Sequence, residues 1–226
     1  MESRGNSVGN NSTNFAGTAG TGRERHPYLY LEHEEGTVIL LAEQTLFKVH
    51  EYFLKQHSII FASMFTLNPG ATPEEGRSDE LPIPLPAVSA VDLARFLLLF
   101  YPRDVVSGDL STLDEWTSVL RLAHRYEFEQ HRTLAIERLE RLATPIDRIL
   151  LARMYDITHW LQEAYYDLCV REEALTYDEG VRLGMADVIL LADLRQRIRG
   201  PVMRSHMHEQ YIRSTIRSKL HALSPA

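Results

Sequence analysis

The sequence is poor in cysteine, with Cys169 the only one among 226 residues. A single cysteine cannot form an intramolecular disulfide, and it excludes a zinc site built from four thiolates. Long apolar runs are also missing: a candidate such as residues 97–101 is far short of the roughly 20 residues of a transmembrane helix. The amino terminus lacks a charged-then-apolar signal pattern, being polar from Glu2 to Asn14. We therefore expect no membrane span and a reducing compartment, the cytoplasm and/or the nucleus.

Basic residues are outnumbered, with 24 Lys and Arg against 31 Asp and Glu and a net charge of −7. Phosphate recognition needs concentrated positive charge, so nucleic acid is disfavoured as a partner. The exception is residues 195–226, where seven basic groups face the single acid Glu209. Ile212, Ile216 and Leu220 recur there at intervals of four, which predicts an amphipathic helix. Two hypotheses stay open for this tail: it docks on the protein's own acidic body, or it binds an anionic partner.

The remaining composition is that of a globular chain, with 44% apolar and 24% charged residues. A chain of this length buries about 70% or more of its unfolded surface, so a core can form without disulfides or metals. Residues 1–27 differ, because Gly, Asn and Ser dominate and Val8 is the only branched aliphatic residue. Such a segment cannot offset its ordering entropy, and we expect a disordered arm.

Strand signals come early in the chain and helix signals come late. Residues 38–41 and 45–49 predict a strand hairpin. Two short helices follow, the second capped by Ser58, and then a loop over residues 66–80. Residues 81–86 contain three prolines, which confines this extended segment to a sheet edge. The rest predicts successive helices: one over 90–100, one that begins within 111–115, one over about 129–142, three that begin at Thr144, Thr158 and Thr176, and two near 186–199 and 206–220.

A series of apolar and aromatic residues in the first half carries a family resemblance. Its pattern is Phe-x-x-His, then Leu, then Ser-x-x-Phe-x-x-Met-Phe, here Phe47, His50, Leu54, Ser58, Phe61, Met64 and Phe65. Tyr101 ends a Leu-Phe-Tyr run, and Ala123 and Tyr126 belong to a Leu-x-x-Ala-x-x-Tyr helix. The segment 28–143 resembles the BTB/POZ domain. Residues 144–226 form a helical region similar to that of small stand-alone fungal BTB proteins, which share its Leu-Cys-x-Arg-Glu-Glu run at 168–173.

The resemblance implies an α+β fold: a small β-sheet flanked by a helical cluster, followed by an all-α C-terminal helical extension. A few strands followed by many helices favour the same class on physical grounds. The resemblance further implies a non-catalytic protein-protein interaction module that self-associates, with the motif residues in structural roles. We expect self-association through the amino-terminal strand, with the first core helices behind it; its candidate residues are Tyr28, Leu29, Tyr30 and Leu31.

The family leaves other partners open. One alternative is a substrate adaptor of a cullin-type ubiquitin ligase, although residues 66–80 lack the apolar-x-Glu signal that cullin-binding members often carry. A more distant one is a transcription-related scaffold; here Thr37 stands where the family usually has Asp, so a charged corepressor groove is disfavoured. Residues 1–26 are also poor helix material, which disfavours the swapped dimers of members with an additional first helix.

Sites with chemical activity are not predicted: we expect no catalytic, cofactor-binding or metal-binding residue. His124, Glu127 and His131 have a spacing that could place three ligands on one helix face, but helix continuity there is doubtful and we interpret them as ordinary histidines and an acid. No nucleophile with an orienting partner accompanies His50. We expect Cys169 to be a small buried hydrophobic residue.

Overall fold

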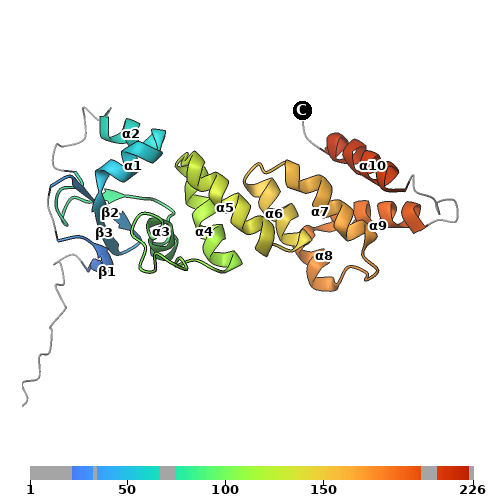
Figure 1. Ribbon diagram of the computed structural model, residues 1–226, viewed down its shortest axis with the longest axis horizontal. Coiled ribbons are helices and arrows are strands. Elements are labelled where there is room, and N and C mark those ends of the chain that lie inside the picture. The colour runs from blue at the N-terminus through green and yellow to red at the C-terminus, as the bar shows by residue number, and fades with distance from the viewer. Residues whose placement is uncertain (1–21, 33–34, 67–74, 200–207, 224–226) are drawn as a thin grey trace, which may run out of the picture. The chain divides into compact units, whose positions relative to one another are not determined.

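The computed structural model describes residues 22–32, 35–66, 75–199 and 208–223 (Figure 1). It divides into two compact units, residues 1–103 and 104–226. Among the described residues, the first unit holds four strands and three helices, and the second holds seven helices. Residues 1–21 of the expected arm and 67–74 of the expected loop lie outside the described residues.

The sheet of the first unit is built around the predicted hairpin. Strands β2 (Thr37–Ala42) and β3 (Thr45–His50) pair antiparallel from Thr37↔His50 to Ala42↔Thr45. Glu43 makes the two-residue turn possible by adopting a positive φ of 53°. The full strand order is β1-β3-β2-β4, so β1 and β4 form the two edges. The hairpin is confirmed and lies at the centre of the sheet.

Strand β1 (Glu24–Tyr30) corrects the expected extent of the disordered arm, because it begins inside residues 1–27. It runs parallel to β3, with Glu24 opposite Thr45 and Tyr30 opposite Lys48. A charged side chain fixes this polar segment: Arg25 donates through Nε to an Asp79 carboxylate oxygen at 2.8 Å and forms an ion pair with it at 2.6 Å. Asp79 is 54 residues away in sequence, so composition alone could not reveal this ordering.

Strand β4 (Ile83–Pro84) is the expected proline-rich edge, shortened to two residues that pair parallel with β2. The aliphatic residues around it do not all face one way, because Leu85 is buried while Leu81 is exposed. Beside it, the carbonyl oxygen of Gly76 accepts a hydrogen bond from the backbone N–H of Ile39 in β2 at 2.8 Å. Its φ is +78°, and a Cβ at this position would lie 2.7 Å from Val38 Cγ2, so only glycine fits.

Three helices complete the first unit. Helix α1 (Glu51–His57) continues from β3, and α2 (Ile59–Thr66) begins where the Ser58 hydroxyl accepts the backbone N–H of Phe61 at 3.0 Å. Helix α3 (Ala90–Leu97) is capped by Ser89 as predicted, but it ends three residues before the expected Phe100. The residues after Leu97 continue as tight turns with i→i+3 backbone hydrogen bonds.

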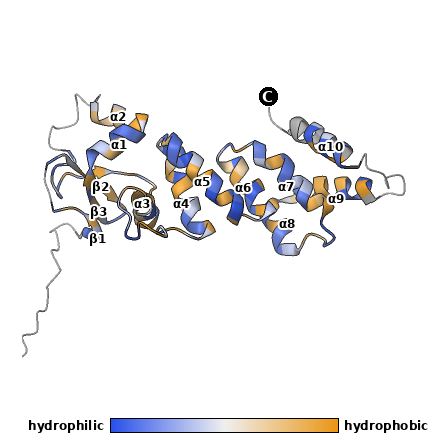
Figure 2. Cartoon of the chain, viewed as in Figure 1, coloured by the Kyte–Doolittle hydropathy of each residue, from blue (hydrophilic) through white to orange (hydrophobic). Residues whose placement is uncertain are grey.

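The second unit consists of helices whose apolar and polar faces alternate in Figure 2. Thr112, Thr144 and Thr176 each form a capping box with the acidic residue three positions later, which fixes three helix starts as predicted. The helices are α4 (Leu113–Arg125), α5 (Glu129–Leu142), α6 (Pro145–Met154), α7 (His159–Val170), α8 (Tyr177–Leu183), α9 (Met185–Arg199) and α10 (His208–Leu223).

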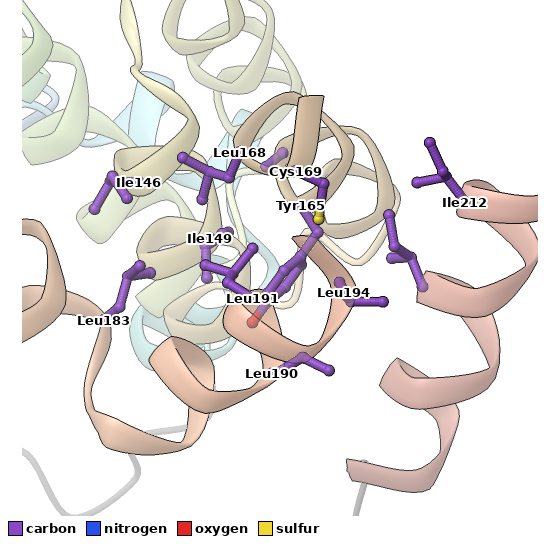
Figure 3. Close-up of a cluster of buried hydrophobic side chains, with 12 residues drawn as sticks. Ile146, Ile149, Tyr165, Leu168, Cys169, Leu183, Leu190, Leu191, Leu194 and Ile212 are labelled. Carbon is purple, nitrogen blue, oxygen red and sulfur yellow. The ribbon is translucent and has the colours of Figure 1, made fainter. Parts of the chain in front are cut away.

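The core of the carboxyl-terminal helices is one apolar cluster, shown in Figure 3. Ile149 of α6, Leu168 of α7 and Leu191 of α9 are fully enclosed, and Ile212 of α10 completes the packing. Met154 of α6 lies outside this packing, since its side chain is exposed. It is the last residue of the helix.

A polar group lies beside this apolar cluster. Asp187 of α9 is 1% exposed and accepts hydrogen bonds from Arg153 of α6 and from the Tyr165 hydroxyl of α7. Arg153 also donates to the Tyr165 oxygen at 2.7 Å. Three helices are therefore joined at a single buried carboxylate whose charge is paired.

Candidate functional site

The motif residues of the first unit form its core and its central junction. Phe47, Leu54 and Phe61 are at most 3% exposed, while Met64 and Phe65 are half-buried on α2. These residues link the hairpin to the helices that follow it. In the second unit, Ala123 of α4 is fully buried and Tyr126, at the end of that helix, is 8% exposed.

His50 and Tyr101 bring the end of β3 to the segment after α3. The Tyr101 hydroxyl oxygen accepts the backbone N–H of His50 at 2.8 Å and lies 3.0 Å from its Nδ1. Burial raises the pKa of Tyr101, and the donated N–H opposes part of that rise. Phe53 packs edge-on against both rings. The imidazole is thus held between aromatic rings. This arrangement fixes the end of β3 against the segment after α3.

The four candidate residues of the interaction strand, residues 28–31, differ in how far their side chains are buried. Leu29 is 1% exposed and belongs to the core, and the Tyr30 hydroxyl donates to Asp79. Leu31 is half-buried, with its backbone N–H donated to Lys48. Tyr28 alone of the four is classed as exposed, at 42%. The expected interaction strand therefore contributes one side chain, that of Leu29, to the core and leaves Tyr28 the most exposed of the four.

The sequence-based prediction placed the first core helices behind the interaction strand, but it named neither Tyr52 nor Ile59, the two residues by which we define the α1–α2 surface. The side chains of Tyr52 and Ile59 are 65% and 67% exposed. Helix α2 has no acidic residue in its first turn and no basic residue in its last, and its sequence IIFASMFT is charge-free throughout. In Figure 2 its colours run from white to orange. An apolar residue on a charge-free helix normally predicts burial, so the exposure of Ile59 could not be anticipated.

A sequence model of the BTB/POZ domain matches residues 29–142. The chain belongs to the BTB/POZ domain family. No curated protein matches the chain. Members of this family are protein-protein interaction modules, and the fold of this BTB protein agrees with membership: a small mixed sheet, a helical cluster and further helices towards the carboxyl terminus. The sequence-based prediction of family and fold is confirmed.

Helix α10, the part of the basic tail described after residue 207, docks on other helices of this BTB protein. Ile212 and Ile216 of α10 are each 1% exposed within the cluster of Figure 3. Arg213 pairs with Glu163 of α7 and Glu209, and its guanidinium lies 4.4 Å from the ring centre of Tyr166. These contacts agree with the hypothesis that the tail docks on the protein's own acidic body. Leu220, the third residue of the predicted stripe, lies among side chains that are not described.

The histidines with metal-like spacing make ring contacts instead. His124 meets Tyr155 edge-on, and His131 does the same with Phe128. Within the described ranges, no group of three or more His, Cys, Asp or Glu is placed to hold a metal ion. Glu127 breaks the expected helix face, because its φ of +54° lies between α4 and α5. The described helices also include none with the length and apolar character to cross a membrane.

Proposed function

We propose that this BTB protein is a non-catalytic, self-associating interaction module, and that the α1–α2 surface forms the contact between two copies. The observation that carries the proposal is a charge-free apolar helix, α2, whose first residue Ile59 is 67% exposed. Covering a side chain of this size contributes about 1.5–3 kcal/mol. A partner that covers Tyr52 and Ile59 would therefore gain substantial binding energy.

A second copy is favoured as the occupant by the charges around this surface. In a twofold interface the same patch faces itself, so any charge at its centre meets a like charge. Helix α2 has none to oppose. On α1, Glu51 forms ion pairs with Lys55 at 2.8 Å and with Arg77 at 3.1 Å, which leaves one net positive charge in this group, outside α2. The surface can thus meet its own image without electrostatic repulsion at the centre.

The test compares two variants, in each of which one exposed apolar residue is replaced by aspartate. Ile59→Asp places a charge on the α1–α2 surface, and Val91→Asp places one on α3, where Val91 is 57% exposed. Both positions lie in the first turn of a helix, where an acid is tolerated, so both variants should fold. Multi-angle light scattering after gel filtration should show dimers for the wild type and Val91→Asp. For Ile59→Asp we expect the dissociation constant of the dimer to be about 30-fold higher or more.

A wild type that stays monomeric at tens of micromolar, or equal effects of the two substitutions, would refute the proposed contact. Circular dichroism confirms that each variant is folded before association is scored. The sequence also left a cullin-type ligase adaptor open. Capture of a cullin amino-terminal region at micromolar concentration, with Ile59→Asp still binding, would support that role in place of self-association.

A further inference from the structure

His26 occupies an unusual position in strand β1. Its ring nitrogen Nδ1 lies 3.2 Å from the backbone nitrogen of Tyr28 and 3.0 Å from that of Leu29. A backbone N–H can only donate, so Nδ1 accepts both hydrogen bonds and carries no proton. The neutral imidazole must therefore hold its proton on Nε2. This tautomer follows from the identity of the donors.

The two amides belong to a bulge in the pairing of β1 with β3. Arg25 lies opposite Leu46 and Tyr30 opposite Lys48, so β1 advances five residues while β3 advances two. The additional residues of β1 lie outside the regular ladder. The imidazole accepts hydrogen bonds from the backbone N–H groups of two of them. His26 thus replaces ladder hydrogen bonds by side-chain hydrogen bonds at the centre of the strand.

The surroundings of His26 favour its neutral form. Its ring stacks on Phe47 of β3 at 4.9 Å, and Phe47 is fully buried. Burial lowers the pKa of His26, and the positive charge of Arg103, from the segment after α3, lowers it further. The other charges of these elements are Lys48 on β3, near the Tyr30 ring, and Glu24 and Arg25 on β1, of which Arg25 is paired with Asp79.

We propose that His26 is a proton-sensitive latch: the neutral imidazole closes the β1 bulge on β3, and protonation opens it. An imidazolium carries a proton on both nitrogens, so Nδ1 would turn from acceptor to donor and face two N–H groups. Both hydrogen bonds are then lost. Once the ring leaves Phe47, the central part of the β3 edge is uncovered and available to another strand.

The direction of the pH dependence follows from the lowered pKa. Because the folded state favours the neutral imidazole, the latch contributes its full stability above the ordinary histidine pKa of about 6.5. That contribution is lost as the pH falls through the lower pKa of the folded state. Neutral solution therefore keeps the latch closed, and acid releases it. The latch acts within one chain and does not depend on the proposed self-association.

The experiment measures amide protection in the full chain labelled with nitrogen-15. Protection factors of the Tyr28 and Leu29 amides, corrected for intrinsic exchange, are compared near pH 7.5 and at successively lower pH. Between the ordinary histidine pKa of about 6.5 and the lower pKa of the folded state, we expect about a tenfold loss of protection at these two amides for each pH unit, and the loss should level off below that lower pKa. Amides of the β2–β3 ladder, such as that of Val49, should keep their protection over the same range.

Two variants separate the latch from general acid instability. In His26→Asn the amide oxygen stands as many bonds from Cα as Nδ1, so it can accept the same N–H groups without titrating. This variant should be protected at every pH, whereas His26→Leu, which has no acceptor, should lose protection even near pH 7.5. Equal acid sensitivity of His26→Asn and wild type would overturn the proposal.

The tautomer gives a readout that requires no variant. Long-range nitrogen-15 correlation spectra near neutral pH should show His26 with its proton on Nε2. A proton on Nδ1 in the folded protein would also overturn the proposal, whatever the variants do.

Discussion

The buried carboxylate of Asp187 allows the sharpest test of how the carboxyl-terminal helices are held together. In Asp187→Ala, the enclosed Tyr165 hydroxyl loses its carboxylate partner, a loss that costs about 1–3 kcal/mol. The charge-assisted hydrogen bonds from Arg153, one of them 2.6 Å long, add about 1.5–3 kcal/mol. The Arg153 side chain is 42% exposed and can regain water, so the lower half of that range applies. We expect a total loss of about 3–5 kcal/mol in the free energy of unfolding.

Tryptophan fluorescence during urea unfolding is the appropriate assay. The chain has two tryptophans, Trp116 and Trp160, and both lie in the second unit, so the signal reports on that unit. Asp193→Ala is the matched control, because Asp193 lies on the same helix in an exposed ion pair with Arg197 and should cost about 0.5 kcal/mol or less.

A double-mutant cycle isolates the hydroxyl contact. With Tyr165→Phe already present, Asp187→Ala should cost about 1–2 kcal/mol less than in the wild type. The reasoning is refuted if Asp187→Ala costs no more than the Asp193→Ala control, or if the two substitutions are additive.

Two further outcomes concern titrating groups of the second unit. The pKa of Glu179 is lowered to about 2, first by the hydrogen bonds from Arg171 and then by the backbone N–H of Thr176, so its stabilising contribution is present above about pH 4.5 and is lost as the pH falls towards 2. Carboxyl-carbon NMR titration measures this, and an ordinary Glu179 pKa would contradict it. Burial raises the pKa of Cys169 to about 11, so a disulfide reagent at pH 8 should leave the native thiol unmodified and react with one thiol per chain in denaturant; rapid reaction of native protein would show that the thiol is accessible.

Much of this fold could be predicted from sequence because its signals are local. The hairpin follows from alternating residues over a few positions, and the starts at Ser58, Thr144 and Thr176 need only a hydroxyl and its neighbours three residues later. The proposed interaction surface was harder to predict. Apolar periodicity predicts that Ile59 is buried, and no pattern in one chain distinguishes burial in a core from burial by a partner.

The features that escaped the sequence depend on partners distant along the chain. Strand β1 is ordered by Arg25 and Asp79, which are 54 residues apart, and Arg153 meets Asp187 across 34 residues. Neither charge pair has a fixed spacing that could identify it. The bulge latch combines both difficulties, because the short-range contacts of His26 arise only where β3 imposes its register.

The prolines beside β4 have a consequence for polymerisation. Pro82, Pro84 and Pro86 lack backbone N–H groups, so that side of the sheet resists the addition of another chain. A fibril grows only if each subunit accepts neighbours on two opposite sides. A sheet that can be extended on one side alone stops growing once that side is filled. The proline-rich edge therefore opposes the growth of filaments by edge-to-edge addition of strands.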